Sequence, residues 1–88
     1  MINVDSKIAI VKGCKALDIS KGVIARVVSI EPMGAEYSHQ VRVTFRFLNG
    51  FRAGKTCVLW ARHPNRLADL TVNLNNGNPC NIVQIRAR

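Results

Sequence analysis

Hydrophobic and polar residues alternate along much of the chain, and the clearest alternation covers residues 40–48. Every odd-numbered position in that segment is Val or Phe, whereas the even-numbered positions include Arg42, Thr44 and Arg46. Successive side chains of a β-strand point to opposite faces of the sheet. The pattern therefore predicts a half-buried strand whose outer face is basic.

A turn follows this predicted strand directly, because Asn49-Gly50 separates it from a further segment that opens with Phe51. Asn-Gly between two such segments is the strongest short-range signal for a β-hairpin, since a type I′ turn needs positive φ at both central residues. We therefore expect a tight hairpin whose partner strand covers residues 51–60, with a bulge or bend at Gly54.

Shorter apolar segments predict the remaining strands, which are expected over residues 8–11, 15–19, 23–30, 70–74 and 82–87. Pro64 interrupts the pattern and is expected to open a short helical turn, because a proline at the first helical position loses no hydrogen bond. No segment of the sequence has the period of an amphipathic helix over three turns. The pattern predicts an all-β fold of five to seven short antiparallel strands, arranged as a small barrel or sandwich.

The length and composition indicate one folded domain over residues 1–88. The longest apolar stretches are too short to cross a bilayer, and the first residues lack the basic start and apolar run of a signal peptide. We therefore expect an intracellular protein or a virion component, with no membrane partner. Cys14, Cys57 and Cys80 are too widely spaced for a disulfide framework and are expected to be reduced, buried thiols.

The segment over residues 13–30 opens with Gly13, carries Lys21-Gly22 in a turn and ends in the run Arg-Val-Val-Ser-Ile. It resembles the KOW motif, which is found in SH3-like barrels of ribosomal proteins and transcription elongation factors. In that family the glycine after the lysine permits a tight turn between two barrel strands, and the resemblance assigns this role to Gly22. The segment departs from the motif at Ala25, where the family has a second glycine, and its loop is shorter. The resemblance implies an SH3-like barrel that binds RNA, with the OB-fold as the nearest alternative.

The balance of charged residues favours a polyanionic partner. Thirteen Lys and Arg residues against five Asp and Glu residues give a net charge of +8, and a field of that sign attracts RNA, DNA or an acidic protein surface. Arg42 and Arg46 are expected to share one strand face, with Arg52 beside them in the hairpin. The ordinary alternative for each arginine is a solvated side chain on the outer face of a strand. The full set of candidate nucleic-acid-binding residues is Lys21, Arg26, Arg42, Arg46, Arg52, Arg62 and Arg66.

Aromatic residues are scarce, so we expect binding to depend on phosphate contacts and to have little sequence specificity. Tyr37, in a polar loop, is a candidate ring for stacking on a base. Trp60 is the second candidate, and its alternative role is to close one end of the barrel.

No combination of residues typical of catalysis occurs in the sequence. His39 and His63 have no carboxylate nearby, the cysteines lack the paired spacing of a zinc site, and the sequence contains no glycine-rich phosphate loop. We therefore expect no catalytic residues, no metal and no cofactor. A small enzyme, the weakest hypothesis, would require a reactive Cys57 or His63.

These observations favour a small basic, non-enzymatic nucleic-acid-binding barrel, with RNA preferred on the strength of the resemblance. The alternative is a protein-interaction or assembly module, either a subunit of a larger particle or a regulator that docks on an acidic partner. Exposed strand edges would give such a module a route to a homo-oligomer.

Overall fold

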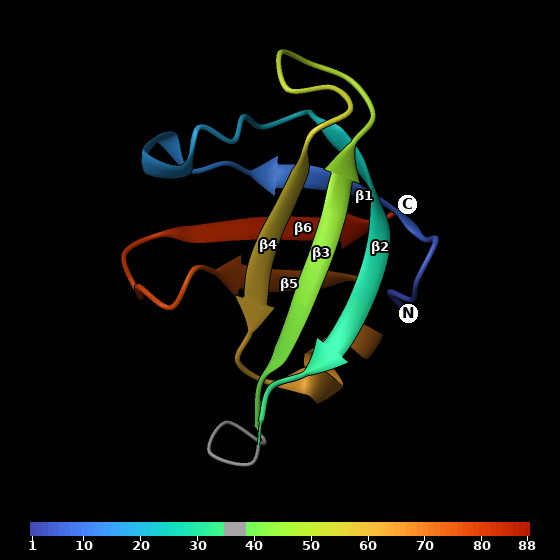
Figure 1. Cartoon of the computed structure of the whole chain (residues 1–88), viewed down its shortest axis with the longest axis vertical. Coiled ribbons are helices and arrows are strands. Elements are labelled where there is room, and N and C mark those ends of the chain that lie inside the picture. Colours follow the sequence, from blue (N-terminus) through green and yellow to red (C-terminus); the bar gives the residue numbers. More distant parts are fainter. Residues whose placement is uncertain (35–38) are drawn as a thin grey trace.

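Alternation of apolar and polar residues builds six β-strands in the computed structural model of the chain, which describes residues 1–34 and 39–88. Each strand pairs antiparallel with the next, and the last pairs back with the first, so that the sheet closes into a barrel (Figure 1). The fold is therefore all-β, as predicted, and is a small barrel of the SH3-like kind. The strands are β1 (Lys7–Lys12), β2 (Ile24–Pro32), β3 (Val41–Phe47), β4 (Thr56–Ala61), β5 (Thr71–Asn75) and β6 (Ile82–Ala87).

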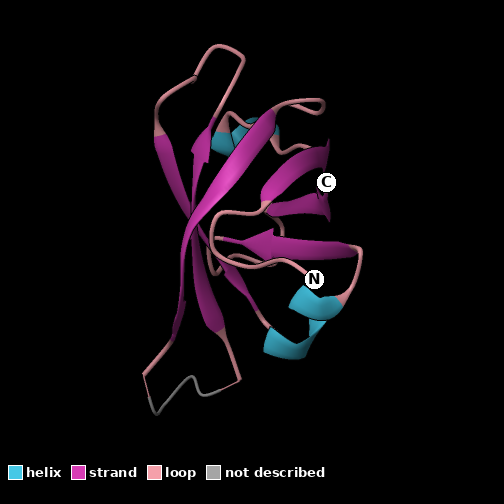
Figure 2. Cartoon of the chain, turned by 90° about the vertical axis from the view of Figure 1, so that its right-hand side faces the viewer, coloured by secondary structure: helices cyan, strands magenta, loops and turns pink. Residues whose placement is uncertain are grey.

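The closed sheet is flattened into two layers that cross steeply. Strands β2, β3 and β4 form one layer, and β1, β5 and β6 run across behind it (Figures 1 and 2). Two short 3-10 turns, η1 (Lys15–Leu17) and η3 (Pro64–Ala68), lie in the connections. The second begins at Pro64, which confirms the helical turn predicted there. Within the described residues, no helix has the length and apolar character needed to cross a membrane.

The core lies between the two layers and consists of side chains from the inward face of every strand. Val43, Phe45 and Phe47 of β3 are at most 2% exposed, as their alternation predicts. The rings of Phe45 and Phe47 pack edge to face, with their centroids 5.5 Å apart. Burial of such side chains contributes about 1.5–3 kcal/mol each relative to exposure, so this core supplies most of the driving force for folding.

The hairpin formed by β3 and β4 is confirmed, but the tight turn predicted at Asn49-Gly50 is wrong. β3 ends at Phe47 and β4 begins at Thr56, so the connection is a loop over residues 48–55. Asn49 is not among the residues with positive φ, which a type I′ turn would require of it. Its side-chain oxygen instead accepts a hydrogen bond from the backbone N–H of Ile24, at 2.9 Å. That contact holds the loop against the start of β2.

The strand predicted over residues 15–19 is also wrong, because η1 occupies residues 15–17 and Asp18 has a positive φ of 57°. The backbone groups of Cys14 and Ile19 bond to each other in both directions, at 2.9 and 3.1 Å, which closes a narrow loop. A Cβ atom on Gly13 would overlap the carbonyl oxygen of Ile19. Glycine is therefore required at position 13 because the two sides of the loop approach so closely.

Candidate nucleic-acid interface

Three basic side chains lie next to one another in a row across β1, β2 and β3. Lys7 is the register partner of Arg26, and Arg26 is the register partner of Arg46. All three are exposed, whereas the residue that follows each of them is buried. Side chains directly opposite each other in a sheet have Cβ atoms about 4.5–5.5 Å apart. We call Lys7, Arg26 and Arg46 the basic row.

The basic row has no acidic counterpart within the described residues. The ion pairs found there are Arg42–Glu31 and Arg66–Asp69, and neither involves the row. Arg26 donates through Nη1 to the backbone oxygen of Asp5, at 3.0 Å, which directs its guanidinium without neutralising it. Like charges directly opposite each other destabilise a sheet. An anion bound across the row would remove that repulsion.

Arg42 shares the outer face of β3 with Arg46, as predicted, but its charge is partly neutralised. Glu31 is its register partner on β2, and the Glu31 carboxylate accepts a hydrogen bond from the Arg42 guanidinium. Both side chains are about half exposed, at 48% and 52%. Arg42 therefore contributes less field to this face than Arg46 does.

Arg52 does not share that face, and the expectation that it lies beside Arg42 and Arg46 is wrong. It belongs to the loop over residues 48–55, where Nη1 donates to the backbone oxygen of Leu17, at 3.2 Å. Its guanidinium lies over the ring of Phe47, 5.1 Å from the centroid. Because Phe47 is a core residue, Arg52 joins η1 to the end of the barrel and has a structural role.

Lys21 is exposed in the turn that precedes β2. Gly22 follows it with a φ of 91°, and the N–H of Gly22 donates to the backbone oxygen of Ile10, at 2.8 Å. This turn lies against the loop over residues 48–55, because a Cβ on Gly50 would sit 3.2 Å from a methyl of Val23. Lys21 therefore lies at the end of the barrel where β2 begins and β3 ends, which is also the end nearest Arg26 and Arg46 (Figure 1).

Phe51, at the same end of the barrel, is an exposed ring that the sequence reasoning missed. Its relative exposure is 102%, so the ring contributes nothing to the core. It was missed because the Asn-Gly signal placed it at the start of a strand. The two glycines at positions 50 and 54 are the signal that identifies a wider loop with this ring inside it.

The two predicted stacking residues have different outcomes. Tyr37 lies outside the described residues. Trp60 is half-buried on the outer face of β4, between its register partners Arg42 and Asn75, so it lies on the wall of the barrel. Its Nε1 is buried and has no hydrogen-bond partner among the described residues. A ring held this way offers less free surface for a base than Phe51 does.

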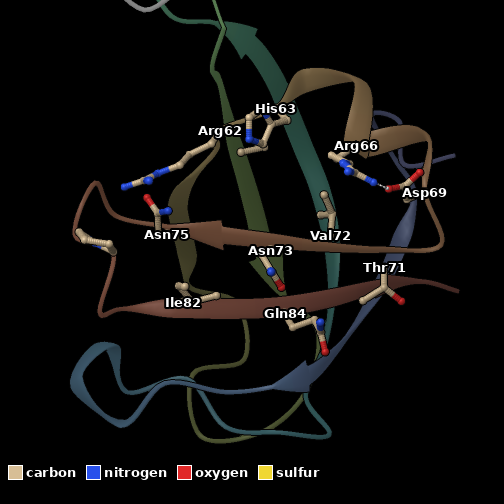
Figure 3. A pocket seen from close by; sticks show the side chains of 12 residues that line it. Arg62, His63, Arg66, Asp69, Thr71, Val72, Asn73, Asn75, Ile82 and Gln84 are labelled. Carbon is tan, nitrogen blue, oxygen red and sulfur yellow. Dashed lines mark hydrogen bonds and ion pairs between the residues drawn. The ribbon is translucent and has the colours of Figure 1, made fainter.

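Arg62 and Arg66 lie away from the basic row, on the far side of the barrel. With His63, they line a groove of about 430 Å³ between the β4–η3 connection and the outer face of β5 and β6 (Figure 3). Arg66 bonds to Asp69 at 3.2 Å. The basic residues predicted from the sequence thus lie on two separate surfaces, one around the basic row and one at the groove. Arg52 belongs to neither, because it packs on Phe47.

The thiols are only partly as expected. Cys14 and Cys57 are half-buried, but Cys80 is exposed, which corrects the expectation of a buried thiol there. Burial raises the pKa of the Cys57 thiol, and the charge of Arg52 and a backbone hydrogen bond at Val58 oppose that rise. In the part of the chain that the structure describes, no group of three His, Cys, Asp or Glu residues is placed to hold a metal ion.

The comparisons with known proteins give no relative for this chain. No family model matches the sequence, and no curated protein and no solved structure is significantly similar to it.

Proposed function

We propose that this protein is a non-enzymatic nucleic-acid-binding barrel that holds backbone phosphates on the basic row. The observation that carries the proposal is the direct juxtaposition of Lys7, Arg26 and Arg46 without an acidic partner among the described residues. Arginine binds phosphate through two parallel N–H donors, and lysine binds it as a point charge. A net charge of +8 adds a long-range attraction that brings a polyanion to this surface.

The residues near the row favour single-stranded RNA as the ligand. Lys21 and the exposed ring of Phe51 extend the basic surface at one end of the barrel. An exposed ring stacks on any unpaired base, a contact that duplexes do not offer along their length. The resemblance of residues 13–30 to the KOW motif supports the same choice, because members of that family bind RNA.

The proposal is tested by fluorescence-anisotropy titration of the intact protein with labelled single-stranded RNA, duplex RNA and single-stranded DNA. Each titration is run at about 50 mM and about 200 mM salt, because phosphate-dominated binding weakens steeply over that range. We expect binding to all three ligands, tightest to single-stranded RNA, and strong salt dependence in each case. Absence of binding at the lower salt, together with a defined oligomer in solution, would instead identify an assembly module.

A further inference from the structure

A groove opens in the barrel wall where β4 and β5 diverge. The two strands are joined at one register pair, Trp60 and Asn75, and the chain that carries η3 bridges the remaining gap (Figure 3). The groove encloses about 430 Å³, which is within the range of sites for small organic ligands. It lies apart from the basic row, so the proposed phosphate contacts do not account for it.

Two amide side chains lie side by side in this groove. Asn73 on β5 and Gln84 on β6 are register partners, and both line the groove (Figure 3). Neither makes a side-chain hydrogen bond to a described residue. Each primary amide presents donors beside an acceptor. Nucleobase edges carry the complementary pattern, which is why Asn and Gln recur in base recognition.

The opposite wall of the groove carries basic side chains. Arg62 and His63 come from the connection between β4 and η3, and Arg66 comes from η3 itself. Figure 3 shows the two arginines at opposite ends with the histidine between them. Arg66 is paired with Asp69, whereas Arg62 forms no ion pair with any described residue. One end of the groove therefore holds a guanidinium with its charge uncompensated.

Apolar side chains complete the lining. Pro79 and Ile82 are exposed along the groove, and such surfaces pack against the face of a flat ring. A simple anion would leave the two amides unused, and an apolar ligand would cover them without hydrogen bonds, which is costly. A ligand with a flat polar ring and an anionic group is complementary to the amides, the apolar surface and the free guanidinium together.

We infer that the groove binds one unpaired nucleotide of a single-stranded nucleic acid, with its base against Asn73 and Gln84 and its phosphate on Arg62. This inference rests on the proposed function and specifies it, because it adds base contacts to a binding mode otherwise carried by phosphates. The strand that crosses the basic row is then contacted at a second place on the barrel.

The test uses NMR titration of the ¹⁵N-labelled full chain with three ligands: a six-nucleotide RNA, an abasic strand with the same number of phosphates, and inorganic phosphate. The side-chain amide signals of Asn73 and Gln84 report on the groove, and the backbone signals of Lys7, Arg26 and Arg46 report on the basic row. We expect the RNA to shift both sets of signals. The abasic strand has phosphates for the basic row and for Arg62 but no base, so it should shift the row signals and leave the two amides unchanged.

Variants make the same distinction by affinity. Asn73→Leu with Gln84→Met keeps side-chain volume but removes the donors and acceptors, and should weaken RNA binding about tenfold while leaving the abasic strand unaffected. Arg62→Gln should lower the affinity for both the RNA and the abasic strand, because both carry phosphates. Lys15→Gln, in η1 and outside the groove lining, is the control for the loss of one charge and should change the affinity of both ligands equally and only slightly.

The possible results separate the two ideas. If the RNA and the abasic strand both shift the NMR signals of the basic row but not those of the groove amides, the inference is overturned and the proposed function stands. Equal shifts of the groove amides by RNA and by inorganic phosphate would also overturn it, since the base would then have no role. No shift anywhere would contradict the proposed function itself.

Discussion

Replacing Arg46 with glutamine should weaken nucleic-acid binding and, at the same time, leave the barrel as stable as before or slightly more stable. Arg46 faces Arg26 directly across β2 and β3, and it forms no side-chain hydrogen bond or ion pair with a described residue. Arg46→Gln therefore removes a repulsion and breaks no contact. If Arg46 stabilised the fold, its replacement would instead lower the free energy of unfolding.

The size of the stability change in Arg46→Gln depends on how many positive charges lie close to Arg46. One like-charge pair directly opposite in a sheet is worth about 0.2–1 kcal/mol. Lys7 lies two strand spacings from Arg46, about 10 Å, which is close to the Debye length at 0.1 M salt, so its contribution is largely screened. For a domain of this size, that gain in the free energy of unfolding corresponds to a rise in Tm of about 1–8 °C. The rise should be smallest in high salt, which screens the repulsion.

The assay is urea unfolding followed by the fluorescence of Trp60, the single tryptophan of the chain, at low and high salt. The matched control is Arg42→Gln on the same strand, which loses the ion pair with Glu31 and should lower the free energy of unfolding by up to about 1 kcal/mol. A loss of more than about 1 kcal/mol in Arg46→Gln, or unchanged affinity for RNA, would refute the reasoning.

Four further outcomes follow from the structure. Phe51→Ala should leave Tm unchanged, because the ring is fully exposed, yet weaken single-stranded RNA binding in anisotropy titrations by about 1–3 kcal/mol. Gly13→Ala should lower Tm by several degrees in a thermal melt, since the added methyl would overlap the Ile19 carbonyl. Arg52→Ala should destabilise the barrel by about 1–2 kcal/mol in urea and leave the salt slope of RNA binding unchanged. Burial raises the pKa of the Cys57 thiol, so less of it is thiolate at pH 8. In a variant that keeps Cys57 as its one cysteine, the folded protein should therefore be alkylated more slowly than the protein unfolded in urea. The alkylation rate should increase with rising pH.

Much of the fold could be predicted because local alternation records which face of each strand is buried. Residues 82–87 form β6 with the bounds expected for it, and Pro64 opens η3 where its restricted backbone predicts a helical turn. The loop after β3 could not be predicted, because the side chain of Asn49 bonds to Ile24 on a different strand. Such a long-range contact competes with the local preference for a tight turn.

The candidate interface was predictable only in part, because it depends on strand register. Lys7 was not among the expected binding residues, since nothing near it in sequence shows that it faces Arg26. Arg52 has the same charge as Arg46 but lies over a core ring. The groove depends on barrel closure, which brings Arg62 and Asn73 into the lining of one groove. The sequence shows which residues are charged, but the pairing of the strands decides which of them lie side by side.

The central claim, that the basic row holds phosphates, is tested most directly by the salt dependence of RNA binding. The slope of log affinity against log salt would be compared between the natural protein and a triple variant with glutamine at Lys7, Arg26 and Arg46. Each lost phosphate contact should reduce the slope by about 0.7 on a single strand and 0.9 on a duplex. We predict a total reduction of about 2 to 3 with the fold retained; an unchanged slope with unchanged affinity would contradict the claim.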